Sequence, residues 1–135
     1  MRHALLATSL LTAAAALTGC DDTIFGAGGG EVEGEGYAAV LSINEAECTG
    51  CHSAGDAPAG GGLDLETDFI AATVNVTGAY DLELIVPGEP ENSLLYQMTT
   101  GVQPVSGAMP FGTGGLTAEQ NAVIEQWILD GALDQ

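Results

Sequence analysis

The sequence predicts a small all-α domain of three or more helices. Three segments carry apolar residues at helical spacing, and the last of them opens with a capping signature. No βαβ pattern is visible along the chain. Of the 135 residues, 116 remain once a predicted signal peptide of 19 residues is removed, which is enough for one small domain and a tether.

The first 19 residues predict export. A short positive start, Met1 to His3, precedes an apolar stretch from Ala4 to Leu17. This stretch is too short for a membrane span and leads into polar residues, so we expect a signal peptide over 1–19 that is cleaved. Leu17-Thr18-Gly19-Cys20 resembles the lipobox of bacterial lipoproteins, in which the cysteine is lipidated. The alternative is an ordinary secretory signal with a chance cysteine.

A tether is expected after the lipidated Cys20. Residues 20–36 include a run of glycine and glutamate that cannot bury a core and predicts a flexible linker. The globular domain should then occupy residues 37–135. An acylated Cys20 would anchor the protein to a bacterial membrane, with the domain in the periplasm or on the cell surface.

The first predicted helix, over residues 37–47, leads directly into Cys48-Thr49-Gly50-Cys51-His52. C-x-x-C-H is the attachment signature of a c-type haem, in which two thiols add to one porphyrin and the adjacent imidazole becomes the proximal iron ligand. On a helical turn, positions i, i+3 and i+4 share one face, so Cys48, Cys51 and His52 should lie together. One copy of the motif predicts one covalent haem.

Other uses of these cysteines fit less well. A Cys48–Cys51 disulfide or a thioredoxin-like redox pair is the alternative, but such pairs belong near a βαβ pattern. A zinc site would need four ligands, whereas beyond Cys20 the chain offers two cysteines and His52.

The next elements are a loop over residues 53–62 and an ambiguous segment over 66–79. Pro87-Gly88-Glu89-Pro90 is typical of a turn, and it predicts that a second helix opens after Pro90 and covers Glu91 to Thr99.

The third helix has the clearest signals. Thr117 is a good N-cap, Gln120 completes a capping box, and Gly131 is suited to the C-terminal end. Its expected buried stripe consists of Val123, Ile124, Trp127 and Ile128.

The sixth iron ligand is narrowed by elimination. His3 leaves with the signal peptide and the remaining chain has no lysine, which leaves Met98 and Met109. Met109 is favoured because it lies in a glycine-rich loop, whereas Met98 lies on a predicted helix near Leu94, where core packing is favoured. Methionine and histidine coordination raises the reduction potential and leaves no open position on the iron, which favours electron transfer over oxygen chemistry.

The whole chain is strongly acidic. It has 19 Asp and Glu residues, and its only Lys or Arg is Arg2, so removal of the signal peptide takes the net charge from −18 to −19. Nucleic-acid binding through phosphate contacts needs Lys or Arg and is excluded. The charge predicts steering towards a redox partner with a basic docking surface, although a solvated surface suited to saline surroundings explains it equally well.

These segments together resemble class I cytochrome c domains. The resemblance rests on the order of a helix, CTGCH, a loop, PGEPENSLLY, MP, LTAEQ and WILDGA, and covers roughly Tyr37 to Leu133. It implies the all-α cytochrome c fold, in which the first and last helices cross beside the haem. It also implies thioether bonds from Cys48 and Cys51, with His52 proximal and Met109 distal. Family members orient the proximal imidazole with a backbone carbonyl, often a proline's, for which Pro58 and Pro87 are both candidates.

The expected function is therefore that of a membrane-tethered mono-haem cytochrome that carries electrons and is not an enzyme. The alternatives are a haem enzyme or gas sensor in which Met109 dissociates, and a domain that uses its haem only structurally. The residues expected to form the wall of the haem pocket are Leu63, Leu65, Pro87, Leu94, Tyr96, Phe111 and Trp127.

Overall fold

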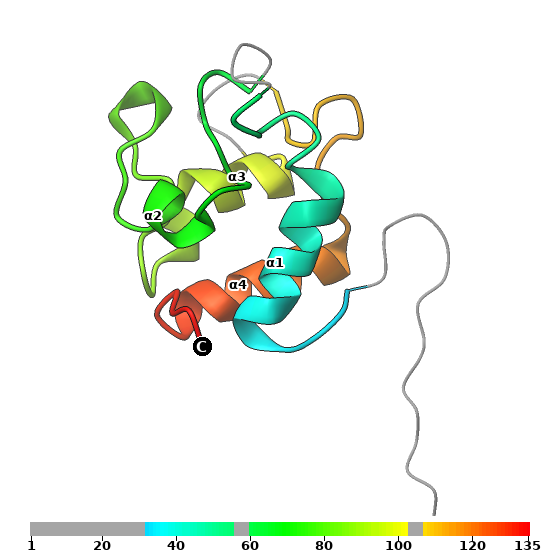
Figure 1. The fold of residues 1–135 in the computed structure, drawn as a ribbon. Coiled ribbons are helices and arrows are strands. Elements are labelled where there is room, and N and C mark those ends of the chain that lie inside the picture. Colours follow the sequence, from blue (N-terminus) through cyan, green and yellow to red (C-terminus); the bar gives the residue numbers. More distant parts are fainter. Residues whose placement is uncertain (1–31, 56–59, 103–106) are drawn as a thin grey trace, which may run out of the picture.

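The computed structural model describes residues 32–55, 60–102 and 107–135 (Figure 1). The predicted signal peptide, Cys20, most of the tether and Pro58 lie outside the described residues. The elements are α1 (Gly36–Glu47), α2 (Phe69–Thr73), the 3₁₀ turns η1 (Ala79–Asp81) and η2 (Pro90–Asn92), α3 (Leu94–Thr100) and α4 (Ala118–Leu129). Within these ranges there is no strand, only isolated bridges, so the predicted all-α class is confirmed. No described helix has the length and apolarity needed to cross a membrane.

The core lies where α1 crosses α4, at the lower centre of Figure 1. Val40 and Ile43 of α1 pack with the buried face of α4. Trp127 is 3% exposed, and its ring lies 5.9 Å from both the Tyr37 and Phe69 rings. Its indole Nε1–H donates to a backbone carbonyl near the C-terminus, so the polar edge of this large side chain is also satisfied.

The predicted capping box of α4 is confirmed. The Thr117 hydroxyl accepts a hydrogen bond from the Gln120 N–H, and Gln120 Oε1 accepts one from the Thr117 N–H. The helix ends at Leu129, two residues before Gly131, whose φ of 101° suits a glycine after a helix end. The buried stripe contains Ile124, Trp127 and Ile128, whereas Val123 is only half-buried.

The second predicted helix is shorter than expected. It begins at Leu94 and not at Glu91, because the chain first forms the turn η2 and then becomes extended at Ser93. The Ser93 hydroxyl accepts from the Val86 N–H and donates to the Glu89 carbonyl, each at 2.9 Å. These bonds tie Ser93 to the preceding turn, so the helix cannot start before it.

The ambiguous segment over residues 66–79 contains one short helix, α2. Its start is capped by the Asp68 carboxylate, which accepts from the Ala71 N–H at 3.0 Å. Phe69 at its first position is buried in the core and carries the segment back against α1 and α4.

Candidate functional site

The CTGCH segment continues α1 as a tight turn. The Cys48 N–H donates to the Asn44 carbonyl at 2.9 Å, and the His52 N–H donates to the Cys48 carbonyl at 2.9 Å. The second bond spans four residues, so Cys48 and His52 lie one helical turn apart on the same side. The Cys51 N–H also donates to the Cys48 carbonyl, at 3.1 Å, so the backbones of all three residues belong to one turn.

The two cysteines have different surroundings. Cys48 is half-buried against the core, and burial together with the nearby Glu47 carboxylate raises the pKa of its thiol to about 11. Cys51 is exposed. The two cysteines are not joined to each other by a disulfide.

His52 is held by its backbone on both sides. Its N–H bonds to Cys48, and its carbonyl accepts from the Leu65 N–H at 2.8 Å. Its ring atom Nδ1 is buried and has no hydrogen-bond partner among the described residues. With Nδ1 turned into the protein, Nε2 is the nitrogen left for a metal.

The metal-binding side chains of this segment fit a metal that is already bound in a macrocycle. No group of three or more His, Cys, Asp and Glu side chains in the described part of the chain could hold a metal ion. A haem brings four nitrogen ligands of its own and needs only axial ligands from the protein. The combination of His52 with two neighbouring cysteines suits a haem, which needs only axial ligands from the protein.

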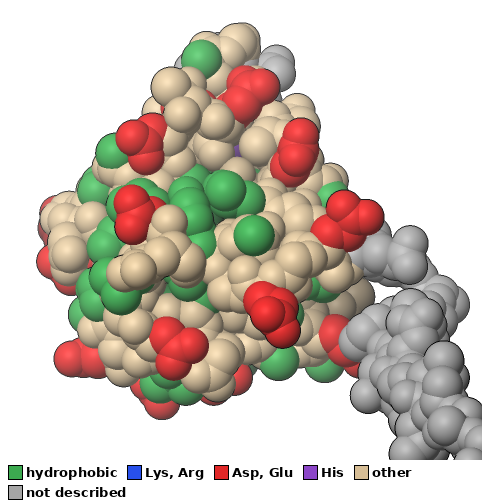
Figure 2. All heavy atoms as spheres, turned by 60° about the horizontal axis from the view of Figure 1, so that its bottom comes forward, with side chains coloured by type: hydrophobic (Ala, Val, Ile, Leu, Met, Phe, Trp, Pro, Cys, Tyr) green, Lys and Arg blue, Asp and Glu red, His purple; other side chains and the backbone are tan. Residues whose placement is uncertain are grey.

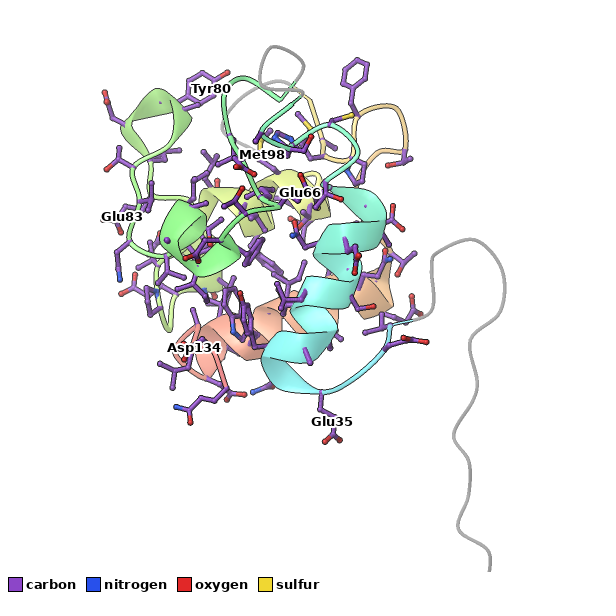
Figure 3. All side chains as sticks on the ribbon, in the orientation of Figure 1. Glu35, Glu66, Tyr80, Glu83, Met98 and Asp134 are labelled. Carbon is purple, nitrogen blue, oxygen red and sulfur yellow. The ribbon has the colours of Figure 1, made fainter. Side chains whose placement is uncertain are left out.

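The two methionines lie close together along the backbone. The Met109 N–H donates to the Met98 carbonyl at 2.9 Å, so the loop containing Met109 is bonded to the last turn of α3. Both side chains are half-buried, and Met98 is not part of the core cluster. Figure 3 shows Met98 on α3, on the side that faces the loops at the top of the view. The structure thus keeps both methionines near the same loops.

The residues expected in the pocket wall fall into three groups. Leu65, Leu94 and Trp127 are buried, with Leu65 and Trp127 in the core cluster itself. Leu63, Pro87 and Tyr96 are half-buried. Phe111 is 85% exposed, so most of its surface is not packed against the described residues.

Tyr96 lies near acidic side chains. Burial, together with the nearby Glu125 and Glu91 carboxylates, raises the pKa of its phenol. This side chain therefore remains a neutral phenol at physiological pH.

Three positions that sequence reasoning missed contribute to the site. Asn44 and Asn121 are buried amides that donate to the Leu65 carbonyl and to the Thr99 and Leu116 carbonyls. Gly60 packs directly against His52. Neither amide belongs to a recognisable motif, and Gly60 stands in a run of three glycines that looks like an ordinary loop.

A separate hollow of about 410 Å³ lies beside α1. Its lining comprises Tyr37, Leu41, Asn44, Glu45, Thr49, Leu65, Glu66, Thr67, Asp68 and Phe69. Neither cysteine of the motif lines it, and neither do His52 and Met109, although Thr49 of the attachment segment does.

Comparison with known families identifies the same segment. Residues 48–110 match the family model described as Planctomycete cytochrome C. The match begins at Cys48 and ends at Pro110, so it spans the CTGCH turn and both candidate methionines. No curated protein and no solved structure matches the chain.

Proposed function

Because the chain carries a cytochrome c-like domain with a covalently bound c-type haem, we propose that it is a membrane-tethered mono-haem carrier of single electrons. When bound, the haem iron supplies the one-electron chemistry by changing between Fe(II) and Fe(III). The observation that supports the proposal is the CTGCH turn, in which backbone hydrogen bonds from Cys51 and His52 to the Cys48 carbonyl hold the three residues in one turn and His52 Nδ1 is buried.

We assign the protein's contributions by residue. Cys48 and Cys51 form the two thioether bonds, His52 supplies the proximal nitrogen, and Met109 supplies the distal sulfur. The assignment of Met109 is supported by its loop, which is bonded to the end of α3 and thereby held in one place. If His52 and Met109 both held the iron, small molecules would have no open position on it, and the haem would supply electron transfer.

The proposed anchor and partner follow from the sequence and the surface. Cys20 carries the lipid, and the domain works in the periplasm or on the cell surface. Figure 2 shows Asp and Glu side chains spread over the visible face, and the described part of the chain contains no Lys or Arg. A redox partner with a basic docking surface would complement this charge and be attracted over a distance.

The distal ligand is tested with Met109→Ala and the matched variant Met98→Ala in the haem-loaded protein. The weak far-red band of sulfur-bound ferric haem should vanish in Met109→Ala and persist in Met98→Ala. Carbon monoxide should bind the reduced Met109→Ala protein at least tenfold more tightly than the reduced unaltered protein, because an axial position is then open.

Two results would redirect the proposal. Loss of the band only in Met98→Ala would make Met98 the distal ligand. Ready binding of carbon monoxide to the reduced unaltered protein would favour a haem enzyme or gas sensor with a labile sixth ligand over an electron carrier.

A further inference from the structure

The hollow of about 410 Å³ beside α1 has apolar surface in its lining. This surface includes the rings of Tyr37 and Phe69, whose centres lie 6.4 Å apart, and the side chain of Leu41. Leu41 is 38% exposed, so the described residues leave part of its surface uncovered. Such a lining suits the hydrocarbon part of a ligand, and the face of an aromatic ring also attracts a cation.

Carboxylates make up the acidic part of the lining. Glu45, Glu66 and Asp68 all line the hollow and are all exposed. Glu45 belongs to α1, and Figure 3 shows Glu66 near the C-terminal end of this helix. The described ranges contain no Lys or Arg, so no basic side chain within them neutralises these charges. The hollow is therefore negatively charged.

Asn44 adds a hydrogen-bond acceptor to the same lining. This residue is 5% exposed, and its Nδ2 donates to the Leu65 carbonyl at 2.8 Å. Its Oδ1 is shielded from solvent and receives no hydrogen bond from the described residues. A buried oxygen without a donor costs free energy, which an N–H group of a ligand in the hollow would recover after a small movement of the amide.

The acidic lining does not form a metal site. Within the described part of the chain, no group of three or more His, Cys, Asp and Glu side chains could hold a metal ion. The lining suits a larger cation in which an apolar stem carries a charged nitrogen group, as in the side chains of Lys and Arg. The stem would lie against Leu41 and the two rings, while the N–H groups would donate to the carboxylates.

The position of the hollow indicates where such a cation would come from. Thr49 lies between the two cysteines of the attachment turn and is part of the lining. A protein that placed a basic side chain in the hollow would therefore lie beside this turn. Glu45, Glu66 and Thr67 are exposed members of the lining, so a side chain that projects from another protein has access to it.

We propose that the hollow beside α1 receives a Lys or Arg side chain of the redox partner and thereby holds that protein against the attachment turn. This inference rests on the proposed function as an electron carrier. It adds to that function the place of contact and the chemical group that the partner presents there. Opposite charge would attract the partner, and the apolar lining would fix the position of its side chain.

The first measurement uses N-acetyl-arginine amide as the probe. It is titrated into isotope-labelled, haem-loaded protein in the reduced state, and NMR follows the backbone amides. Saturable shifts should be confined to the lining of the hollow, and the uncharged probe N-acetyl-norleucine amide should produce none. Glu66→Gln should weaken binding of the arginine probe roughly threefold, because one exposed charge of the lining is lost.

Glu83→Gln is the matched control, because it changes the net charge equally. Glu83 is exposed, is not part of the lining, and lies well away from α1 in Figure 3. Binding of the arginine probe should be the same in Glu83→Gln as in the unaltered protein.

The second measurement is the rate of electron exchange with a lysine-rich, basic cytochrome c, followed by stopped-flow absorbance at low ionic strength. The second-order rate constant should be roughly threefold lower in Glu66→Gln than in Glu83→Gln. The difference between the two variants should disappear at high salt, because salt screens exposed charges.

Shifts spread over the whole surface, or equal affinities of the two variants for the arginine probe, would overturn the inference. A hollow that the haem itself fills would give no shifts in the haem-loaded protein and would overturn it as well. Equal exchange rates in the two variants would reject the hollow as the place of contact and leave the electron carrier standing. Absence of a reversible one-electron couple in voltammetry would reject the proposed electron carrier itself.

Discussion

Trp127 shows how one side chain holds the crossing of the two long helices. Its ring is 3% exposed, stacks on Tyr37 with ring centres 5.9 Å apart, and lies at the same distance from the Phe69 ring. Its indole N–H donates to the Leu133 carbonyl at 2.8 Å. A single residue thus joins α1, α2, α4 and the C-terminal segment. Although we predicted Trp127 in the haem pocket wall, its described contacts are those of the protein core.

We expect Trp127→Ala to lower the free energy of unfolding of the haem-loaded protein by about 3–5 kcal/mol, the usual cost of deleting a buried indole. Denaturant unfolding followed by circular dichroism would measure the loss. Leu129→Ala on the same helix is the control, because Leu129 is 51% exposed and its loss should cost under about 1 kcal/mol. Similar costs for the two variants would contradict a central role for Trp127.

At the level of elements, the predicted helix ends agree with the structure where they depend on contacts between residues close in sequence. α1 begins at Gly36, next to the predicted 37, and both end at residue 47. The capping box of α4 is formed as predicted because its bonds span only three residues. The predicted start of α3 was wrong by three residues, because Ser93 bonds to Val86. Val86 lies seven positions earlier, and the periodicity of a helix does not encode such a contact.

Asn121 connects the elements around the Met109 loop. It is 9% exposed on α4, and its Nδ2 donates to the Thr99 carbonyl at 3.2 Å and to the Leu116 carbonyl at 3.1 Å. Thr99 lies in the last turn of α3, and Leu116 follows the glycine-rich loop. One amide therefore holds α4, α3 and this loop in register.

Asn121→Asp should loosen the loop, because a carboxylate cannot donate to the two carbonyls and instead repels them. We expect a stability loss of about 1–3 kcal/mol and disappearance of the far-red sulfur-to-iron band several degrees below global unfolding. Asn44→Asp is the control, since Asn44 lies on α1 and its amide donates to the Leu65 carbonyl in the same way. A band that melts together with the fold in both variants would show that Asn121 does not hold the ligand loop.

On the scale of the whole molecule, the attachment turn and the proposed tether lie at opposite ends of α1. Its 12 residues span about 18 Å, and the attachment turn follows its C-terminal end. At the other end, a Cβ atom on Gly36 would lie 3.5 Å from the carbonyl of the terminal residue Gln135. With the proposed anchor at Cys20, the tether joins the domain at the end of α1 remote from the haem. In the proposed function, this arrangement would leave the haem end free to meet a redox partner.

The charge of the molecule makes its stability depend on salt. The described residues contain carboxylates but no Lys or Arg, so nearly all their long-range interactions are repulsive. Raising ionic strength from 0.01 M to 1 M shortens the screening length from about 30 Å to about 3 Å. The melting temperature of the haem-loaded protein should therefore rise with sodium chloride at pH 7. A melting temperature that does not change with salt would contradict this account.

The same measurement at lower pH supplies the control. Protonation of mutually repelling carboxylates should raise the melting temperature between pH 7 and about 5, and the effect of salt should shrink. Asp64 behaves oppositely, because bonds from the Thr67 hydroxyl and from the Glu66 and Thr67 N–H groups lower its pKa below 3.8. Its contribution to stability is complete above its unfolded value and is lost as pH falls through the folded one. Stability should accordingly decline again below about pH 4.

The sequence by itself determined the attachment motif, the all-α class, the capped last helix and the scarcity of Lys and Arg, of which Arg2 is the one example. These features depend on residue identity or on contacts within a few positions of the chain. Only the tertiary structure decided that Gly60 packs against His52 and that Asn121 joins three elements. Each of these contacts joins residues separated by loops, and a loop's path is set by packing and long-range hydrogen bonds and not by local periodicity.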